Sequence, residues 1–393
     1  MYENIIAERM SRLGTESAFG ILAEAQALEA QGKNIVHMEI GQPDFKTPSN
    51  IVEAGYRAML DGYTGYGPTP GYPVLRQAIA EDAAARKGIT TNADEVIVTP
   101  GGKPIMFYTM LLLVNAGDEV IYPNPGFPIY ESCIKFAGGV PVPMPLIAKN
   151  NFKVDLDLLE KSVTDKTKLI IINNPSNPTG SVISKSEIEK IAEILRKHPQ
   201  VMVLSDEIYD RIIYGDKMTS IASLPDMKDR TIILDGFSKA YSMTGWRIGY
   251  GIMNKELAKG VEKLMVNSNS CTASFTQMAA LEALKGPQDS VTHMVEAFAE
   301  RRAYITEALS AIPGIICPKP EGAFYAFPDI SAFGQSCEEF YHGLMYEAGV
   351  ACAWGTSFGK YGEGCIRLSY ATSMDNLREA VRRIGKYTQG LRK

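Results

Sequence analysis

The segment GFSKAYSMTGWRIGY, residues 236–250, holds one lysine among small, hydroxylic and aromatic residues directly after an apolar run. A lysine amine with its ordinary pKa of ~10.4 is a poor nucleophile near neutral pH, so catalytic lysines lie in desolvated or cationic surroundings. Lys239 meets this requirement, because an apolar run precedes it and Arg247 follows eight residues later. The segment therefore predicts a lysine that forms a Schiff base.

Three other segments carry polar groups that could serve the same site. In VTPGGKPIMF, residues 98–107, a strand-like run passes through Gly101 and Gly102 into a helix, whose free N–H groups and dipole would face an anion. Asp206 ends an apolar run in VLSDEIYD, and Asn177 lies in NNPSNPTG. Taken alone, the glycine motif is equally typical of an ordinary strand-to-helix turn, Asp206 is better explained as a helix cap, and NNPSNPTG could be a simple turn.

Arg367 lies in GCIRLSYA, which is apolar enough for a strand. An arginine there could be an ordinary surface residue, but its guanidinium is also the fork that binds a carboxylate through two hydrogen bonds. We therefore keep Arg367 as a candidate substrate-binding residue.

The elements that must position these residues form a repeating pattern from about residue 90 to 285. Short β-branched runs end in Gly, Pro, Asn or Asp, and helix-like segments often follow; the runs are DEVIVTPGGK, GDEVIYPNPGF, TKLIIINNPSNPTG, QVMVLSDEIYD and RTIILDGFSK. This alternation predicts a mostly parallel α/β sheet. Ligands of such sheets bind outside the carboxyl ends of the strands, where these polar residues would converge.

A different pattern flanks this region. Residues 11–32 are predicted to form a helix, and VTHMVEAFAERRAYITEAL, residues 291–309, has helical periodicity that could link two domains. After about residue 290, GAFYAFP and GCIRLSYA are typical of strands in a smaller α+β domain. A chain of 393 residues with 45% hydrophobic residues fits two domains of this kind.

Charge and cysteine content favour a soluble cytoplasmic protein. The net charge of −5 and the scattered lysines and arginines argue against a nucleic-acid partner. Six cysteines form no C-x-x-C pair, as expected for reduced thiols. No apolar run reaches the ~18 residues of a membrane span, so we expect no membrane partner.

Three rival classes of enzyme fit poorly. GTSFG, residues 355–359, matches the nucleophile elbow of a hydrolase, but no histidine follows it. The four histidines are far apart with no H-E-x-x-H, so we expect no metal site. GYGPTPG is one residue too long for a dinucleotide-binding loop and lacks a preceding strand.

A phosphate cradle, a carboxylate, an aromatic face and a Schiff-base lysine at one sheet edge are the parts that hold pyridoxal phosphate. With these motifs, and with GQPDF, YGPTPGYPVLRQAI, GAFYAFPDI and IRLSYA, the chain resembles the class I/II (fold type I) pyridoxal-phosphate aminotransferases from about residue 10 to 385. The resemblance is strongest to the prokaryotic aspartate-aminotransferase-like subgroup.

The resemblance implies an α/β fold with a mostly parallel seven-stranded sheet between helices and a smaller α+β domain. It assigns residues 1–45 to an N-terminal arm and part of the small domain, 46–285 to the large cofactor-binding domain, and 286–393 to a linking helix and the C-terminal small domain. It also implies a homodimer with shared active sites, because Tyr66 matches a tyrosine that reaches the phosphate in the neighbouring subunit.

The same resemblance assigns roles residue by residue. Lys239 would bind the cofactor covalently and carry the proton, Asp206 would pair with the pyridine nitrogen, and Tyr209 would act with Asn177 on the ring's 3′-oxygen. Phe127 would stack on the ring. The phosphate would be held by Gly101, Gly102, Lys103, Ser238 and Arg247, the first three through backbone N–H groups.

The α-carboxylate of the substrate would bind Arg367, assisted by the Gly41 backbone and the Asn177 side chain. Lys103 matches a lysine that recognises a distal carboxylate, so we expect an aminotransferase that moves an amino group from an L-amino acid, aspartate or glutamate, to a 2-oxo acid such as 2-oxoglutarate by a ping-pong mechanism. A surface lysine is an equally good reading of Lys103.

Two positions depart from the family pattern: Gly236 replaces a hydroxylic residue, and Phe127 stands where many members have tryptophan. Both leave the substrate open. A carbon–sulfur β-lyase with the same cofactor, or an aminotransferase for aromatic or small neutral amino acids, remains an alternative.

Overall fold

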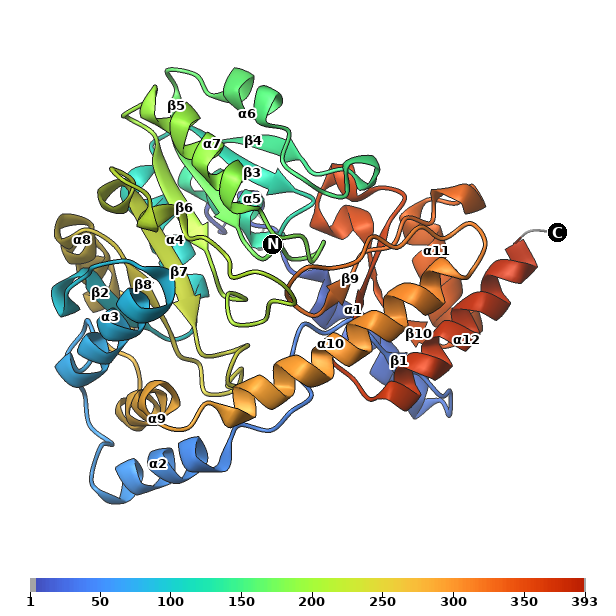
Figure 1. Ribbon diagram of the computed structural model, residues 1–393, viewed down its shortest axis with the longest axis horizontal. Helices are drawn as coiled ribbons and strands as arrows, with labels where there is room; N and C mark the ends of the chain where they lie inside the picture. The colour runs from blue at the N-terminus through green and yellow to red at the C-terminus, as the bar shows by residue number, and fades with distance from the viewer. Residues whose placement is uncertain (1–4, 392–393) are drawn as a thin grey trace.

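The computed structural model describes residues 5–391 and contains one large sheet between two layers of helices (Figure 1). The strand order is β2-β8-β7-β6-β5-β3-β4, and only β8 runs antiparallel to its neighbours. The strands are β2 Val96–Thr99, β3 Glu119–Asn124, β4 Val140–Pro145, β5 Thr167–Asn173, β6 Met202–Asp206, β7 Thr231–Gly236 and β8 Gly249–Ile252. The predicted mostly parallel, seven-stranded α/β sheet is confirmed.

Both faces of the sheet are buried because each central strand is apolar at successive positions. In β5, Leu169 and Ile171 pack with α4 Lys103–Leu113, α5 Ile129–Ala137 and α8 Lys255–Val266, whereas Ile170 and Ile172 pack on the opposite face with α7 Lys185–Arg196. Near β2 and β8 that opposite face is covered by α3 Pro73–Lys87 and α9 Ser274–Lys285. Helices α2 Ser49–Leu60 and α6 Leu156–Ser162 complete this part of the molecule.

The second part of the molecule combines both ends of the chain. The predicted strands appear as β9 Tyr325–Ala326 and β12 Ile366–Ser369, which form an antiparallel sheet with β11 Ala353–Trp354. A parallel pair, β1 Val36–His37 and β10 Val350–Ala351, joins the N-terminal segment to it. The helices here are α1 Ser17–Ala30, α11 Cys337–Gly343 and α12 Met374–Leu391.

The long helix α10, Asp289–Ser310, runs from the large sheet to the second part, as expected for the predicted linking helix (Figure 1). The predicted N-terminal helix over 11–32 is shorter in the structure, because a separate turn of 3₁₀-helix covers Glu8–Arg12 and α1 begins only at Ser17. Within residues 5–391, no helix combines the length and apolar character that crossing a membrane requires.

Candidate active site

A cavity of about 650 Å³ opens at the carboxyl ends of β5, β6 and β7, with its far wall supplied by the second part of the molecule. It brings together residues from segments far apart in the sequence. The predicted site residues that line it are Gly41, Gly102, Lys103, Phe127, Asn177, Asp206, Tyr209, Ser238, Lys239, Arg247 and Arg367. Of the predicted set, only Gly101 and Tyr66 do not line the cavity.

Lys239 lies in the turn that follows β7, and its amine donates a hydrogen bond to the Gly41 carbonyl. Burial lowers the pKa of Lys239 to about 8, and the positive charges of Arg367 and Lys103 act in the same direction. The negative charge of Glu16 opposes them. Near pH 8, about half of the Lys239 amines are therefore neutral and nucleophilic.

Asp206 is the last residue of β6 and is buried. Burial raises its pKa to about 6, although Tyr130 donates a hydrogen bond to its Oδ2 at 2.5 Å and the Ile208 N–H donates to its Oδ1. Both of these partners are neutral, and the strongest charges acting on its pKa come from Asp235 and Glu207, which are negative. A cationic ring nitrogen would supply the missing counter-charge.

The first turn of α4 faces the cavity through Gly102 and Lys103, and the first N–H groups of a helix have no partner within it. Ser238 and Arg247 line the same wall. Gly101 has a φ of 88°, and a Cβ at this position would overlap the Arg247 guanidinium. The N–H of Gly101 donates to the Thr99 carbonyl at 2.8 Å. It is therefore already hydrogen-bonded within the chain, whereas the sequence predicted that it would bind the phosphate.

A close backbone approach explains the unusual Gly236. This residue pairs with Gly249 of β8, and a Cβ on Gly236 would lie 2.9 Å from the Gly249 Cα. A hydroxylic side chain at position 236 would therefore displace the backbone of β8. The groups on this wall that could bind an anion are the start of α4, Ser238 and Arg247.

Arg367 reaches the cavity from β12 and is buried between two aromatic rings, with its Cζ 4.6 Å from the Tyr325 centroid and 4.7 Å from that of Phe358. It donates to Asn177 Oδ1 at 3.1 Å and to the Glu39 carbonyl. Its Nε has no hydrogen-bond partner within the described residues. A buried donor of this kind fits a bound carboxylate.

The structure adds residues that the sequence did not single out. Tyr325 shares a hydrogen bond of 2.7 Å with the Tyr209 hydroxyl, and Asn173 Oδ1 accepts from the Asn177 N–H. Tyr130 and Glu16 also line the cavity. Tyr325 lies in the quoted GAFYAFP motif, which was the only available signal for it.

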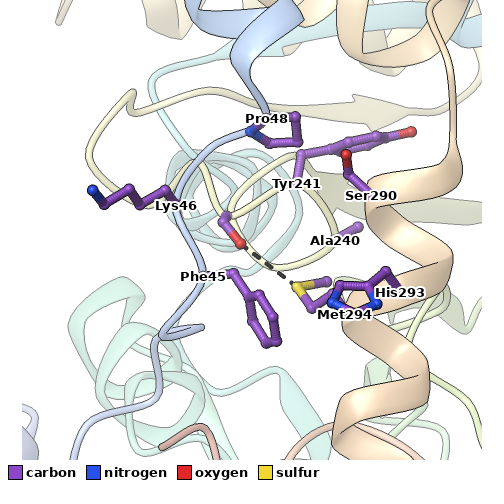
Figure 2. A pocket seen from close by; sticks show the side chains of 9 residues that line it. Phe45, Lys46, Pro48, Ala240, Tyr241, Ser290, His293 and Met294 are labelled. Atoms are coloured by element: carbon purple, nitrogen blue, oxygen red, sulfur yellow. Dashed lines mark hydrogen bonds between the residues drawn. The ribbon is translucent and has the colours of Figure 1, made fainter.

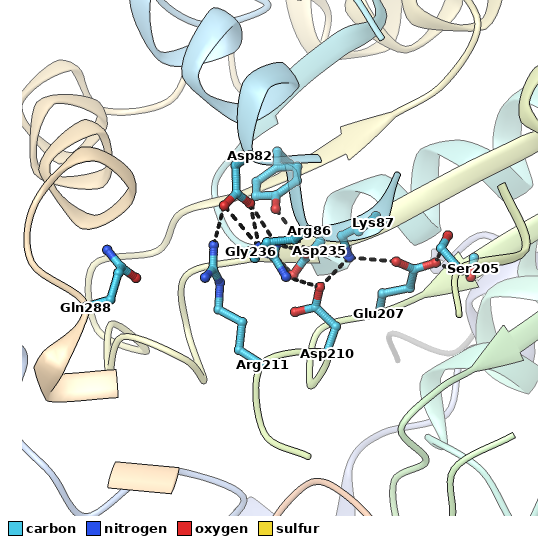
Figure 3. Close-up of polar contacts among 12 residues, drawn as sticks. Asp82, Arg86, Lys87, Ser205, Glu207, Asp210, Arg211, Asp235, Gly236 and Gln288 are labelled. Carbon is cyan, nitrogen blue, oxygen red and sulfur yellow. Dashed lines mark hydrogen bonds and ion pairs between the residues drawn. The ribbon is translucent and has the colours of Figure 1, made fainter. Parts of the chain in front are cut away.

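Buried charges tie α3 to the chain after β6 and to the end of β7 (Figure 3). The Lys87 ammonium lies 2.5 Å from Asp210, 2.6 Å from Glu207 and 3.0 Å from Asp235. Burial alone would lower the pKa of Lys87, but these three carboxylates raise it above its ordinary value. Lys87 therefore remains charged.

This buried cluster adjoins the cavity through the chain itself. Glu207 follows Asp206 directly, and Asp235 precedes Lys239 by four residues. Arg86 extends the cluster to Asp82 and Asp210, at 2.7 and 2.6 Å. The cluster thus ties the chain directly after Asp206 to β7, which leads into the turn that carries Lys239.

A smaller cavity of about 190 Å³ lies beyond the Lys239 turn, against the start of α10 (Figure 2). Phe45 and His293 lie across it in edge-to-face contact, with ring centroids 6.3 Å apart. The Ser242 hydroxyl donates to the Met294 sulfur at 3.5 Å. Here the chain around Phe45, the turn after Lys239 and the start of α10 pack together.

The chain is similar to known proteins over nearly its whole length. A family model described as aminotransferase class I and II matches residues 33–384. Aspartate aminotransferase of Bacillus sp. (strain YM-2) is 40% identical, covering 98% of this chain and 100% of that one.

Two solved structures show the same likeness. Aspartate aminotransferase from Thermus thermophilus with maleate has a TM-score of 0.93 at 34% identity, covering 97% of this chain and 99% of that one. The aromatic aminotransferase from Pyrococcus horikoshii OT3 has a TM-score of 0.89 at 37% identity, with coverages of 94% and 99%.

The buried cluster predicts a large effect of Lys87→Met on stability. Removing one partner of a buried ionic network leaves carboxylates uncompensated, so the free energy of unfolding should fall by about 3–5 kcal/mol. Urea denaturation measures the change. Lys197→Met is the matched control, because both side chains of its ion pair with Glu160 are exposed, so its loss should have a far smaller effect. Equal losses in the two variants would contradict the prediction.

Proposed function

Because this chain belongs to the family of class I and II aminotransferases, we propose that the cavity described above is its active site and that its amino donor is a dicarboxylic amino acid. The chain is a pyridoxal-phosphate-dependent aminotransferase, which moves an amino group from an amino acid to a 2-oxo acid. The observation that carries the site assignment is the convergence of Lys239, Asp206 and Arg367 on one cavity.

The cavity residues fit pyridoxal phosphate. When bound, this cofactor supplies an aldehyde that reacts with amines and a protonated ring that draws electrons from the substrate's α-carbon. We assign the ring nitrogen to Asp206, whose neighbouring charges are negative. Asn177 and Tyr209 would hydrogen-bond the ring's 3′-oxygen, and Phe127 would stack on the face of the ring.

The phosphate would be bound by the N–H groups of Gly102 and Lys103 at the start of α4, together with Ser238 and Arg247. All four line one wall of the cavity. A helix start with a flanking arginine supplies both oriented donors and positive charge for a phosphate. Gly101 serves this wall by leaving room for the Arg247 guanidinium rather than by donating its own N–H.

Lys239 moves the proton in the proposed reaction. With a pKa of about 8, its amine both accepts and returns a proton near neutral pH. The Gly41 carbonyl, which accepts a hydrogen bond from this amine, holds it within the cavity. Lys239 would take up and give back the proton of the substrate's α-carbon at its Nζ, and donor and acceptor would follow in ping-pong order.

Arg367 would bind the α-carboxylate that every amino-acid substrate shares. Asn177 and the Glu39 carbonyl hold two of its nitrogens, and the rings of Tyr325 and Phe358 restrict its plane. A guanidinium fixed in this way binds a planar carboxylate without first losing side-chain freedom. The backbone of Gly41, beside it in the cavity, completes this subsite.

For the donor's side chain we propose a carboxylate, as in aspartate or glutamate. Lys103 lines the cavity and is half-exposed, so its ammonium is within reach of a bound substrate, although it is paired with Glu16. The similarity to proteins named aspartate aminotransferase supports the same substrate class.

We also propose a homodimer. The Tyr66 side chain is 92% exposed and lies outside the cavity of its own chain, which suits a residue that completes a partner's site. The domain boundaries after residues 45 and 285, and a cytoplasmic location consistent with six free cysteines, remain predictions.

The lowered pKa of Lys239 predicts how the cofactor attaches. Protein stripped of cofactor should bind pyridoxal phosphate covalently at a rate that rises with pH and levels off above about pH 8, because the neutral amine is the reactive form. Absorbance of the bound cofactor follows the reaction. Lys239→Ala should show neither the absorbance of covalently bound cofactor nor transamination. An inflection near the ordinary lysine pKa of ~10.4 would contradict the assignment.

A donor panel tests the substrate. With 2-oxoglutarate as acceptor, kcat/KM should be highest for aspartate among aspartate, alanine and phenylalanine. Lys103→Met should lower the aspartate value by about tenfold or more, the scale of a hydrogen bond between charged groups, and leave phenylalanine nearly unchanged. Preference for alanine or phenylalanine would refute the proposed donor. Pyruvate released from cysteine conjugates without any oxo acid would instead favour a β-lyase.

The dimer is tested at Tyr66. Light scattering should give twice the mass of one chain, and Tyr66→Phe should raise the Kd for pyridoxal phosphate by about tenfold, as expected for one hydrogen bond to a charged group. Tyr56→Phe on α2 is a matched control, since Tyr56 is also exposed and lies outside the cavity. A monomer would exclude the shared site, and a dimer with unchanged affinity in Tyr66→Phe would remove Tyr66 from it.

A further inference from the structure

Glu16 places a negative charge inside the cavity, although it comes from the N-terminal segment just before α1. Its Oε2 accepts a hydrogen bond from the Lys103 ammonium. The same ammonium lies 5.3 Å from the ring centroid of Phe127, the predicted stacking residue. Lys103 is therefore bound by a carboxylate of the chain itself.

The Glu16–Lys103 pair lies among apolar side chains but remains in contact with water. Ala18 and Phe19 follow Glu16 along α1, and Met106 lies one turn after Lys103 along α4, so apolar side chains line the cavity on both sides of the pair. The Glu16 side chain is 22% exposed and that of Lys103 is 49% exposed. An ion pair with this much water contact is weak and can exchange partners.

The chemistry of the pair bears on substrate choice. The Glu16 carboxylate is the same functional group as the distal carboxylate of aspartate or glutamate, and both would seek the Lys103 ammonium. Two carboxylates at one ammonium repel each other, so Glu16 weakens the binding of a dicarboxylic substrate unless its carboxylate moves away from Lys103. An uncharged side chain has no such conflict, because the intact pair is neutral and the wall around it is apolar.

We propose that Glu16 is a specificity-determining residue that acts as an exchangeable counter-ion of Lys103, so that one site accepts both dicarboxylic and uncharged substrates. Dicarboxylic substrates bind by displacing Glu16 from Lys103, whereas uncharged ones bind beside the intact pair. This inference rests on the proposed function, because it assumes that the cavity binds the substrate.

Ligand binding to the cofactor-loaded enzyme tests the proposal without relying on turnover. Calorimetric titration gives the Kd of maleate, a dicarboxylate without an amino group, and of 3-phenylpropanoate, a monocarboxylate with an aromatic ring. In Glu16→Gln the Kd of maleate should fall by about three- to fivefold, the range that an exposed ion pair supports, whereas that of 3-phenylpropanoate should change less than twofold.

Glu160→Gln is the matched control. Glu160 pairs with Lys197 on the surface at 2.6 Å, so this variant makes the same change in net charge outside the cavity. It should leave both Kd values unchanged. An equal improvement for maleate in Glu160→Gln would show a general charge effect and overturn the proposal.

Kinetics separates this proposal from the proposed function. Glu16→Gln should raise kcat/KM for aspartate relative to phenylalanine, both with 2-oxoglutarate. If the wild-type enzyme transaminates but Glu16→Gln changes both substrates equally, or changes neither, the role of Glu16 is refuted and the function stands. If the wild-type enzyme transaminates neither substrate, the proposed function fails and this inference fails with it.

Discussion

One buried ammonium group holds together the two strand ends that carry the central residues of the site. Lys87, at the end of α3, contacts carboxylates that belong to the chain after β6 and to the end of β7. Asp206 is the last residue of β6, and Lys239 lies in the turn three residues after β7, more than thirty residues later in the sequence. The β6–β7 pairing ends at Asp206 and Leu234, so the chain after β6 and the turn after β7 need an anchor of their own. The buried cluster supplies such an anchor.

Charge is distributed unevenly within the cavity. Lys239 shares the cavity with Arg367, Lys103 and Arg247, and burial together with these cations lowers its pKa to about 8. Asp206 experiences the opposite environment, because burial and neighbouring carboxylates raise its pKa to about 6. The cationic wall suits a phosphate and carboxylates, and the acidic end suits a ring nitrogen. One polarised cavity thus distinguishes the two ends of a bound cofactor.

The sequence predicted most of this fold because its central strands are apolar on both faces. All five β-branched runs became strands of the large sheet. Two strands had no clear signal. β4 contains three prolines, which strands tolerate only at an edge, and β4 is an edge strand. β8 reads GYGI, and its two glycines weaken the strand signal but allow Gly249 to lie against Gly236. These strands depend on packing rather than on propensity.

The site residues also divide into those that the sequence could predict and those that it could not. Motifs identified the residues that contact the cavity from strand ends and turns. They could not identify Tyr130, whose hydroxyl meets Asp206 across 76 residues, or Glu16, which meets Lys103 across 87. Lys87 likewise looks like an ordinary helix-end lysine in the sequence. Contacts at such separations follow from how the elements pack, and no local pattern encodes them.

The two carboxylate-binding groups differ in how firmly they are held, and this difference matches the task of a ping-pong enzyme. Donor and acceptor enter one site in turn and share an α-carboxylate, whereas their side chains can differ. Arg367 is buried, and two aromatic rings and two hydrogen bonds fix its position. Lys103 is half-exposed, and its partner Glu16 comes from a segment outside the large sheet. The site is therefore rigid where its substrates are alike and adjustable where they differ.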